Sequence, residues 1–129
     1  MKRSFNLSVF FVCAIFLVLG CRGNPVLNID DAPIEVSGSG EGKSIKKAII
    51  RAGASLGWAV KDVGPGHLTA TLFLRKHMAK VDIFYSATKY SIKYKDSQHL
   101  NYDGTNIHKN YNSWVTNLNN KIQVQLSAM

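Results

Sequence analysis

The sequence is poor in cysteine and has no long apolar run, and each scarcity excludes a class of protein. Only two of its 129 residues are cysteines, Cys13 and Cys21, too few for the disulfide framework that stabilises many small exported domains. The longest uncharged apolar run, residues 9–20, is too short for a comfortable membrane span, which needs about 20 residues. The folded part must therefore be stabilised by its core.

The first 20 residues have the pattern of an export signal. Lys2 and Arg3 precede the apolar run, and a positive start followed by a short apolar region is typical of secretory signals. Removing residues 1–20 leaves enough chain for one small domain. It also removes two of the 16 basic residues and none of the 8 acids, so the mature net charge is +6. This charge either attracts the protein to anionic lipid or envelope polymers or only aids solubility.

The end of the apolar run, VLGC at residues 18–21, resembles the lipobox of bacterial lipoproteins. The resemblance implies cleavage before Cys21 and lipidation of that cysteine; the alternative is an ordinary signal peptide with a chance cysteine. Each buried methylene contributes about 0.8 kcal/mol to membrane binding, so several acyl chains are an almost permanent anchor. Arg22 stands where an aspartate favours inner-membrane retention in Gram-negative lipoproteins. The resemblance therefore implies the outer membrane, with the domain facing the periplasm.

After Cys21 the composition indicates a tether and then one domain. Residues 21–42 are rich in Pro and Gly and predict a tether with a short strand at 34–36, followed by a single domain at 43–129. The stretch SGSGEGKS, residues 37–44, nearly matches the phosphate-binding pattern G-x-x-x-x-G-K-[ST]. Ser37, however, stands at the first glycine, where a β-carbon hinders the tight turn. We therefore predict a hinge and no nucleotide site.

An amphipathic helix is predicted at each end of the domain. Apolar residues recur at helical spacing in residues 43–57 and again in residues 107–122. We expect Ser44 and Asn106 to cap these helices and Gly57 to end the first one. The first helix also has a basic face, which we expect to rest on anionic head groups near the anchor; it consists of Lys43, Lys47 and Arg51.

The segment between the helices predicts a sheet. Four runs with alternating apolar residues predict strands. They are residues 58–63, 68–77, 80–85 and 90–95. The expected registers pair Leu74 with Ile83 around a two-residue turn at 78–79, and pair Ile83 with Ile92. The predicted fold class is α+β: a four-stranded antiparallel sheet with both helices packed on one face.

The run from GWAVKDV to WVTNL, residues 57–118, resembles a family of small Gram-negative envelope lipoproteins without a settled function. Its most distinctive stretch is IHKNYNSWVTNL. The resemblance implies an envelope lipoprotein domain and transfers no catalytic residues.

Two patterns suggest chemistry, and each has a simpler interpretation. DSQH, residues 96–99, contains the residue types of a hydrolase triad, but consecutive loop residues rarely supply triad geometry, and turns favour the same types. His99 and His108 flank an Asp-Gly turn, but a zinc site would need two more ligands. Alternatively, His108 packs or caps locally. We predict no catalytic residue, metal or cofactor, and no nucleic-acid partner.

The expected registers create one candidate surface on the outer face of the sheet. Phe73 and Phe84 would face each other, with charged residues around them, as in a binding surface; alternatively, the pair is covered or simply tolerated. We predict a non-enzymatic lipoprotein that binds another envelope component, protein or anionic polymer. A periplasmic carrier of metal, haem or lipid is the alternative. The predicted surface consists of Phe73, Arg75, Asp82, Phe84 and Lys93.

Overall fold

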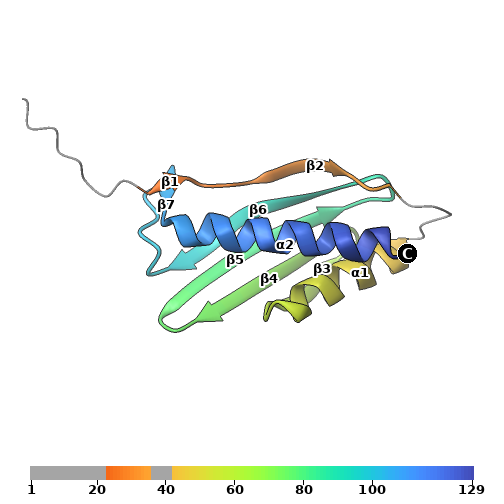
Figure 1. Cartoon of the computed structure of the whole chain (residues 1–129), viewed down its shortest axis with the longest axis horizontal. Helices are drawn as coiled ribbons and strands as arrows, with labels where there is room; N and C mark the ends of the chain where they lie inside the picture. The colour runs from red at the N-terminus through yellow and green to blue at the C-terminus, as the bar shows by residue number, and fades with distance from the viewer. Residues whose placement is uncertain (1–22, 36–41) are drawn as a thin grey trace, which may run out of the picture.

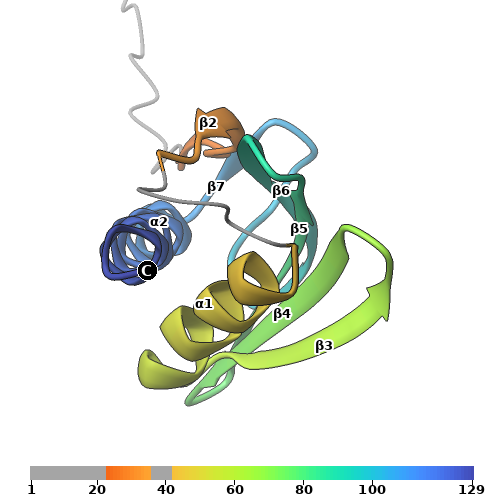
Figure 2. The same cartoon turned by 90° about the vertical axis from the view of Figure 1, so that its right-hand side faces the viewer.

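The computed structural model describes residues 23–35 and 42–129, and these residues form an α+β fold, as predicted. Two helices lie on one face of an antiparallel sheet, which curves around them (Figures 1 and 2). In chain order the elements are β1 (Asn24–Pro25), β2 (Ile29–Pro33), α1 (Gly42–Ser55), β3 (Ala59–Gly64), β4 (His67–Leu74), β5 (His77–Tyr85), β6 (Lys89–Gln98), β7 (Asn106–Ile107) and α2 (Lys109–Ser127).

The main sheet has five strands in the order β2-β6-β5-β4-β3, one more than predicted, and β1 pairs with β7 separately. The predicted pairing of Ile83 with Ile92 is confirmed. The predicted β4–β5 register is wrong, because Leu74 opposes His77 and the turn lies at residues 75–76. In the observed register Ala79 enters the core opposite Leu72 instead of occupying a turn. The shift of six residues is even, so the predicted inward and outward faces are unchanged.

The fifth strand comes from the segment predicted to be a tether. Residues 23–35 pack on the domain: β2 pairs with β6, and Ile34 is buried. Apolar residues recur through this segment and contact the core, which outweighs its Pro- and Gly-rich composition; they are Val26, Leu27, Ile29 and Ala32. The tether prediction is therefore wrong for 23–35, and the short strand lies at Ile29–Pro33 instead of 34–36. Residues 36–41, with most of SGSGEGKS, lie outside the described residues.

Gly23 packs closely against the backbone of Ile107. A β-carbon at Gly23 would stand 2.3 Å from the Ile107 carbonyl oxygen, so only glycine fits without movement of the backbone. The Val26 N–H donates to the Thr105 carbonyl at 3.0 Å. Asn112 of α2 donates to the Pro25 carbonyl and accepts from the Leu27 N–H, both at 2.9 Å. The chain is thus held against the domain from Gly23 to Leu27.

We expect Gly23→Ala to loosen this segment locally. The amides of Val26 and Leu27 should exchange hydrogen about tenfold faster, because a local opening about 1.4 kcal/mol easier gives that factor. The amide of Ile83, at the centre of the sheet, should be unaffected. Gly42→Ala is the matched control, since a β-carbon at Gly42 meets nothing within 4 Å. Unchanged protection at Val26 would contradict a fixed start.

The first helix, α1, matches its predicted apolar stripe but not its predicted start. Its buried residues include Ile45 and Ile49, as expected. The helix begins at Gly42, so Ser44 lies inside the first turn and is not the cap. Gly57 ends the helix as predicted: its φ is +86°, and the Trp58 N–H donates to the Gly53 carbonyl at 3.0 Å, the bond of a glycine C-cap.

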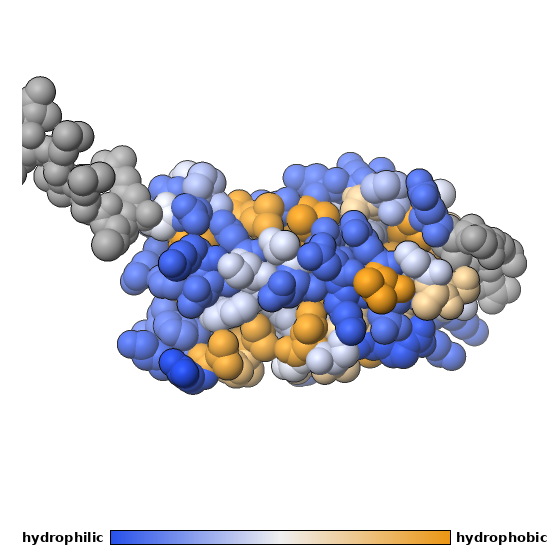
Figure 3. Space-filling model, in the orientation of Figure 1, coloured by the Kyte–Doolittle hydropathy of each residue, from blue (hydrophilic) through white to orange (hydrophobic). Residues whose placement is uncertain are grey.

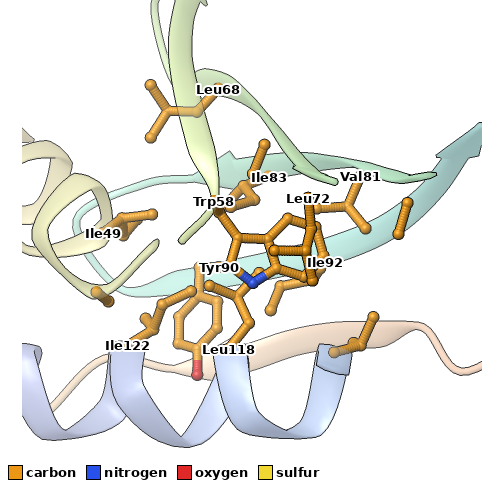
Figure 4. Packing of buried hydrophobic residues seen from close by; sticks show 14 of the residues in the cluster. Ile49, Trp58, Leu68, Leu72, Val81, Ile83, Tyr90, Ile92, Leu118 and Ile122 are labelled. Atoms are coloured by element: carbon orange, nitrogen blue, oxygen red, sulfur yellow. The ribbon is translucent and has the colours of Figure 1, made fainter. Parts of the chain in front are cut away.

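The second helix, α2, is capped by His108 and not by Asn106. The His108 Nδ1 accepts a hydrogen bond from the Asn110 N–H at 3.1 Å, whereas Asn106 lies in β7 and cannot start the helix. The local role considered for His108 is thus confirmed. The apolar side of α2 packs on the sheet and α1, where Leu118, Ile122, Tyr90 and Trp58 converge (Figure 4).

Because neighbouring strands run antiparallel, the connections between them lie at two opposite ends of the molecule. Gly23, the β4–β5 turn, the β6–β7 loop and the start of α2 lie at one end, on the left in Figure 1. Hydrogen bonds join these parts: His77 Nδ1 lies 2.7 Å from the His99 carbonyl oxygen, and the His108 N–H donates to the Leu100 carbonyl at 2.8 Å. We call this the Gly23 end. The start of α1 lies at the opposite end.

Candidate functional site

The predicted outer-face surface is split by the observed register. Phe73 opposes Met78, and Phe84 opposes His67, so the two phenylalanines do not face each other. Arg75 lies in the turn at the Gly23 end and not beside Asp82. The other three predicted residues remain together, because Asp82 opposes Lys93 and Phe84 lies two positions further along β5. The error has the same origin as the wrong β4–β5 turn.

Asp82 is the centre of the remaining group. Its Oδ1 lies 2.7 Å from His67 Nε2 and 3.4 Å from Lys95 Nζ, and its side chain is only 16% exposed. The His67 ring stacks on Phe84 with centroids 4.4 Å apart, and Phe84 remains 43% exposed. We call these residues, with the register partner of Asp82, the outer-face cluster: His67, Asp82, Phe84, Lys93 and Lys95.

Sequence reasoning missed His67 and Lys95 in this cluster, for different reasons. His67 follows the Gly-rich turn and was not assigned to the predicted surface, although the correct β4 register places it opposite Phe84. Lys95 is an extra residue in β6, since Val81 pairs with Tyr94 but Lys80 pairs with Asp96. Simple alternation cannot reveal such a bulge, which redirects a side chain locally.

Ion pairs extend the cluster toward β2. Lys93 pairs with Asp30, and the Lys89 Nζ lies 3.6 Å from the Asp31 carboxylate. These pairs are largely exposed, so each contributes at most about 1 kcal/mol to stability. Their main effect is to alternate positive and negative charge across this part of the sheet. The outer face is therefore close to neutral here, in contrast to the basic chain as a whole.

The predicted basic face of α1 is present, but not where it was expected. Lys43, Lys47 and Arg51 are exposed, and Arg51 Nε donates to Gln125 Oε1 of α2 at 3.3 Å. The helix starts at the end opposite Gly23, so the start of this face does not lie near Gly23 (Figure 1). Sequence reasoning did not single out Lys46, which pairs with Asp62 of β3 at 2.8 Å. This contact lowers the pKa of Asp62 and raises that of Lys46.

The DSQH residues do not assemble a triad. Ser97 Oγ lies 2.8 Å from the Tyr94 hydroxyl, and the Asp96 carboxylate accepts a bond from the Ser97 N–H at 2.8 Å. His99 has a φ of +57°, and its carbonyl oxygen contacts His77. Asp96, Ser97, His99 and Tyr102 are among the residues that line an open depression of about 510 Å³ at the Gly23 end. Its geometry supplies a polar surface but no activated nucleophile.

Three tyrosines pack beside this depression. The Tyr94 ring lies 4.1 Å from Tyr102 and 5.6 Å from Tyr111, measured between centroids. The Tyr111 hydroxyl is buried and has no hydrogen-bond partner among the described residues. Burial raises the pKa of both Tyr94 and Tyr111, so these phenols stay protonated at neutral pH. Their role is to close the core at this end.

The histidines each have a separate local environment. His67 contacts Asp82, His77 contacts the β6–β7 loop, and His108 caps α2. Within the two described ranges, no three His, Cys, Asp or Glu side chains come close enough to hold a metal ion. His99 and His108 thus lack the further ligands that a zinc site needs.

None of the helices in residues 23–35 and 42–129 is long and apolar enough to cross a bilayer. No protein-family model, curated protein or solved structure matches the chain.

Proposed function

We propose that the protein is a non-enzymatic lipoprotein of the outer membrane whose domain faces the periplasm and binds another envelope protein. The lipobox-like VLGC supports lipidation of Cys21. The observation that carries the proposal is the fixed position of Gly23. Two residues span at most about 7 Å, so an anchor on Cys21 holds the domain directly on the membrane. This replaces the long tether expected from the composition.

This attachment determines which end of the domain faces the membrane. The strands of the main sheet run along the long axis of the molecule, away from the Gly23 end (Figure 1). A domain anchored at that end stands upright on the membrane. Its helices cover one face of the sheet, and the other face, with the outer-face cluster, is open to the side (Figure 2). A protein in the same membrane or in the periplasm can reach it.

The charge pattern decides which kind of partner fits the outer-face cluster. An anionic polymer requires a surplus of cations, whereas Asp30, Asp31 and Asp82 neutralise the lysines there. Alternating charges around an exposed aromatic ring suit a protein surface of complementary pattern, with Phe84 as the anchor residue. The same pattern discriminates against partners that place like charges opposite one another.

We expect Phe84→Ala to weaken this interaction about thirtyfold, the effect of losing a 2 kcal/mol anchor residue. The measurement is in-cell cross-linking of the native lipoprotein, followed by identification of the captured protein and titration of the variants against it. Phe73→Ala is the matched control, because Phe73 is an exposed phenylalanine of the same face at the opposite end of the sheet. Equal losses for both variants, or none for Phe84→Ala, would refute this docking surface.

A further inference from the structure

The β4–β5 turn has features that the proposed function does not use. Phe73 is 72% exposed and Leu74 is 47% exposed, and Phe73 has the highest exposure of any large hydrophobic residue among those described. Arg75 and Lys76 follow directly, both exposed, and neither forms an ion pair within the described residues. We call residues 73–76 the hairpin tip. Exposed apolar residues beside free cations are unfavourable in water but suit an anionic lipid surface.

The hairpin tip lies at the end of the molecule where the described chain begins. His77, directly after the tip, contacts the His99 carbonyl, and the loop after His99 is bonded to the start of α2, next to Gly23. Figure 1 draws this turn and Gly23 at the same left-hand end, and Figure 3 shows hydrophobic surface beside strongly hydrophilic surface at the corresponding lower corner. Gly23, the first described residue, and the hairpin tip therefore lie at the same end of the fold.

Other features of the Gly23 end also favour contact with an anionic lipid surface. Tyr102 is exposed there, so with Phe73 and Leu74 this end has three of the seven exposed large hydrophobic residues of the described chain. Lys109 begins α2, and the first turn of this helix has no acid, although helix dipoles favour acids there. The carboxylates at this end, Asp96 and Asp103, accept hydrogen bonds from backbone N–H groups within three residues of their own positions.

We propose that the hairpin tip inserts into the head-group region of an anionic phospholipid membrane, with Phe73 and Leu74 at the acyl boundary and Arg75 and Lys76 on lipid phosphates. This inference rests on the proposed lipid anchor for its geometry. The anchor fixes one side of the Gly23 end to the membrane, and the tip supplies a second contact. The short link from Cys21 sets which end of the domain faces the membrane, and the second contact limits the tilt that this link leaves free.

The conformation of the turn holds these side chains in exposed positions. Arg75 adopts a φ of +55°, which only a few per cent of non-glycine residues do, and it closes a two-residue turn between Leu74 and His77. A short, well-paired hairpin keeps the tip rigid, because β4 and β5 pair without interruption from His67–Phe84 to Leu74–His77. Phe73 and Leu74 point to opposite faces of the hairpin, so the tip is apolar on both sides.

The test uses the full lipoprotein, purified from cells and reconstituted into vesicles of phosphatidylethanolamine and phosphatidylglycerol with brominated acyl chains. Phe73→Trp and Phe84→Trp introduce a reporter at the tip and at the opposite end of the sheet. We expect the bromines to quench the fluorescence added by Phe73→Trp and not that added by Phe84→Trp. Equal quenching at both positions, or none at position 73, overturns the proposal.

A charge variant tests the cations separately. In the Phe73→Trp background, Arg75→Glu with Lys76→Glu should abolish the added quenching, because loss of two lipid contacts lowers the affinity of the tip about thirtyfold. Lys43→Glu with Lys47→Glu is the matched control at the opposite end of the molecule. Palmitate labelling of the same preparations separates the two proposals. Labelled protein without quenching at position 73 refutes the tip alone, whereas unlabelled protein with quenching refutes the anchor and supports the tip.

Discussion

Replacing Cys21 by serine should abolish the incorporation of palmitate into this protein. Only the thiol of Cys21 stands at the end of the lipobox-like VLGC, directly after the apolar run, and a hydroxyl cannot take its place as the lipid acceptor that the resemblance implies. Cells expressing wild type or Cys21→Ser, grown with labelled palmitate, give the measurement. Mass spectrometry of the wild-type protein should find Cys21 as its first residue, carrying acyl chains.

The chain contains its own control for this experiment. Cys13 lies inside the apolar run, among the residues that we expect to be removed, so Cys13→Ser should label like wild type. If Cys21→Ser still incorporates palmitate, or if the wild-type protein incorporates none, the anchor is refuted. The upright arrangement of the domain then loses its basis, because the position of Gly23 bears on membrane attachment only through residue 21.

Patterns within single elements were predictable from the sequence. The buried stripe of α1 and the alternation in β4 to β6 follow from periodicity, since burial on one face demands a fixed spacing. Gly57 was predictable as the end of α1 because glycine adopts its positive φ without strain. The fold class followed, because two apolar helix stripes and one apolar sheet face bury each other.

Relations between distant segments were not predictable in the same way. β2 pairs with β6 across about 60 residues of sequence. Composition describes only the local segment, in which Pro and Gly suggest a tether, and says nothing of a distant pairing partner. Periodicity also cannot fix a register, since sliding β4 by an even number of residues keeps every face. This ambiguity separated Phe73 from Phe84. Asp82, Phe84 and Lys93 were found together because the register between β5 and β6 was right at these positions, whereas the bulge at Lys95 was missed.

Leu118→Ala should lower the free energy of unfolding by about 3 kcal/mol, within the range of 2–5 kcal/mol seen for buried leucines. Leu118 has no exposed surface and lies where α2, α1 and the sheet meet (Figure 4). A β-carbon on Gly53 of α1 would be 2.6 Å from Val60 and 4.0 Å from Leu118, so the two helices have little room to close the cavity. Urea unfolding of the chain from residue 21, with Cys21→Ser in all variants, gives the measurement.

Val124→Ala on the same helix is the matched control. Val124 is 59% exposed, so its truncation should change the free energy of unfolding by less than about 0.5 kcal/mol. A small domain is stable by only about 5–15 kcal/mol, so the loss at Leu118 is a large fraction of the total. Because Asn112 of α2 also holds Pro25 and Leu27, loosening the helix should speed amide exchange at Leu27. A loss below about 1 kcal/mol would mean that α2 does not support the Gly23 end, and the short link from Cys21 would then no longer orient the domain.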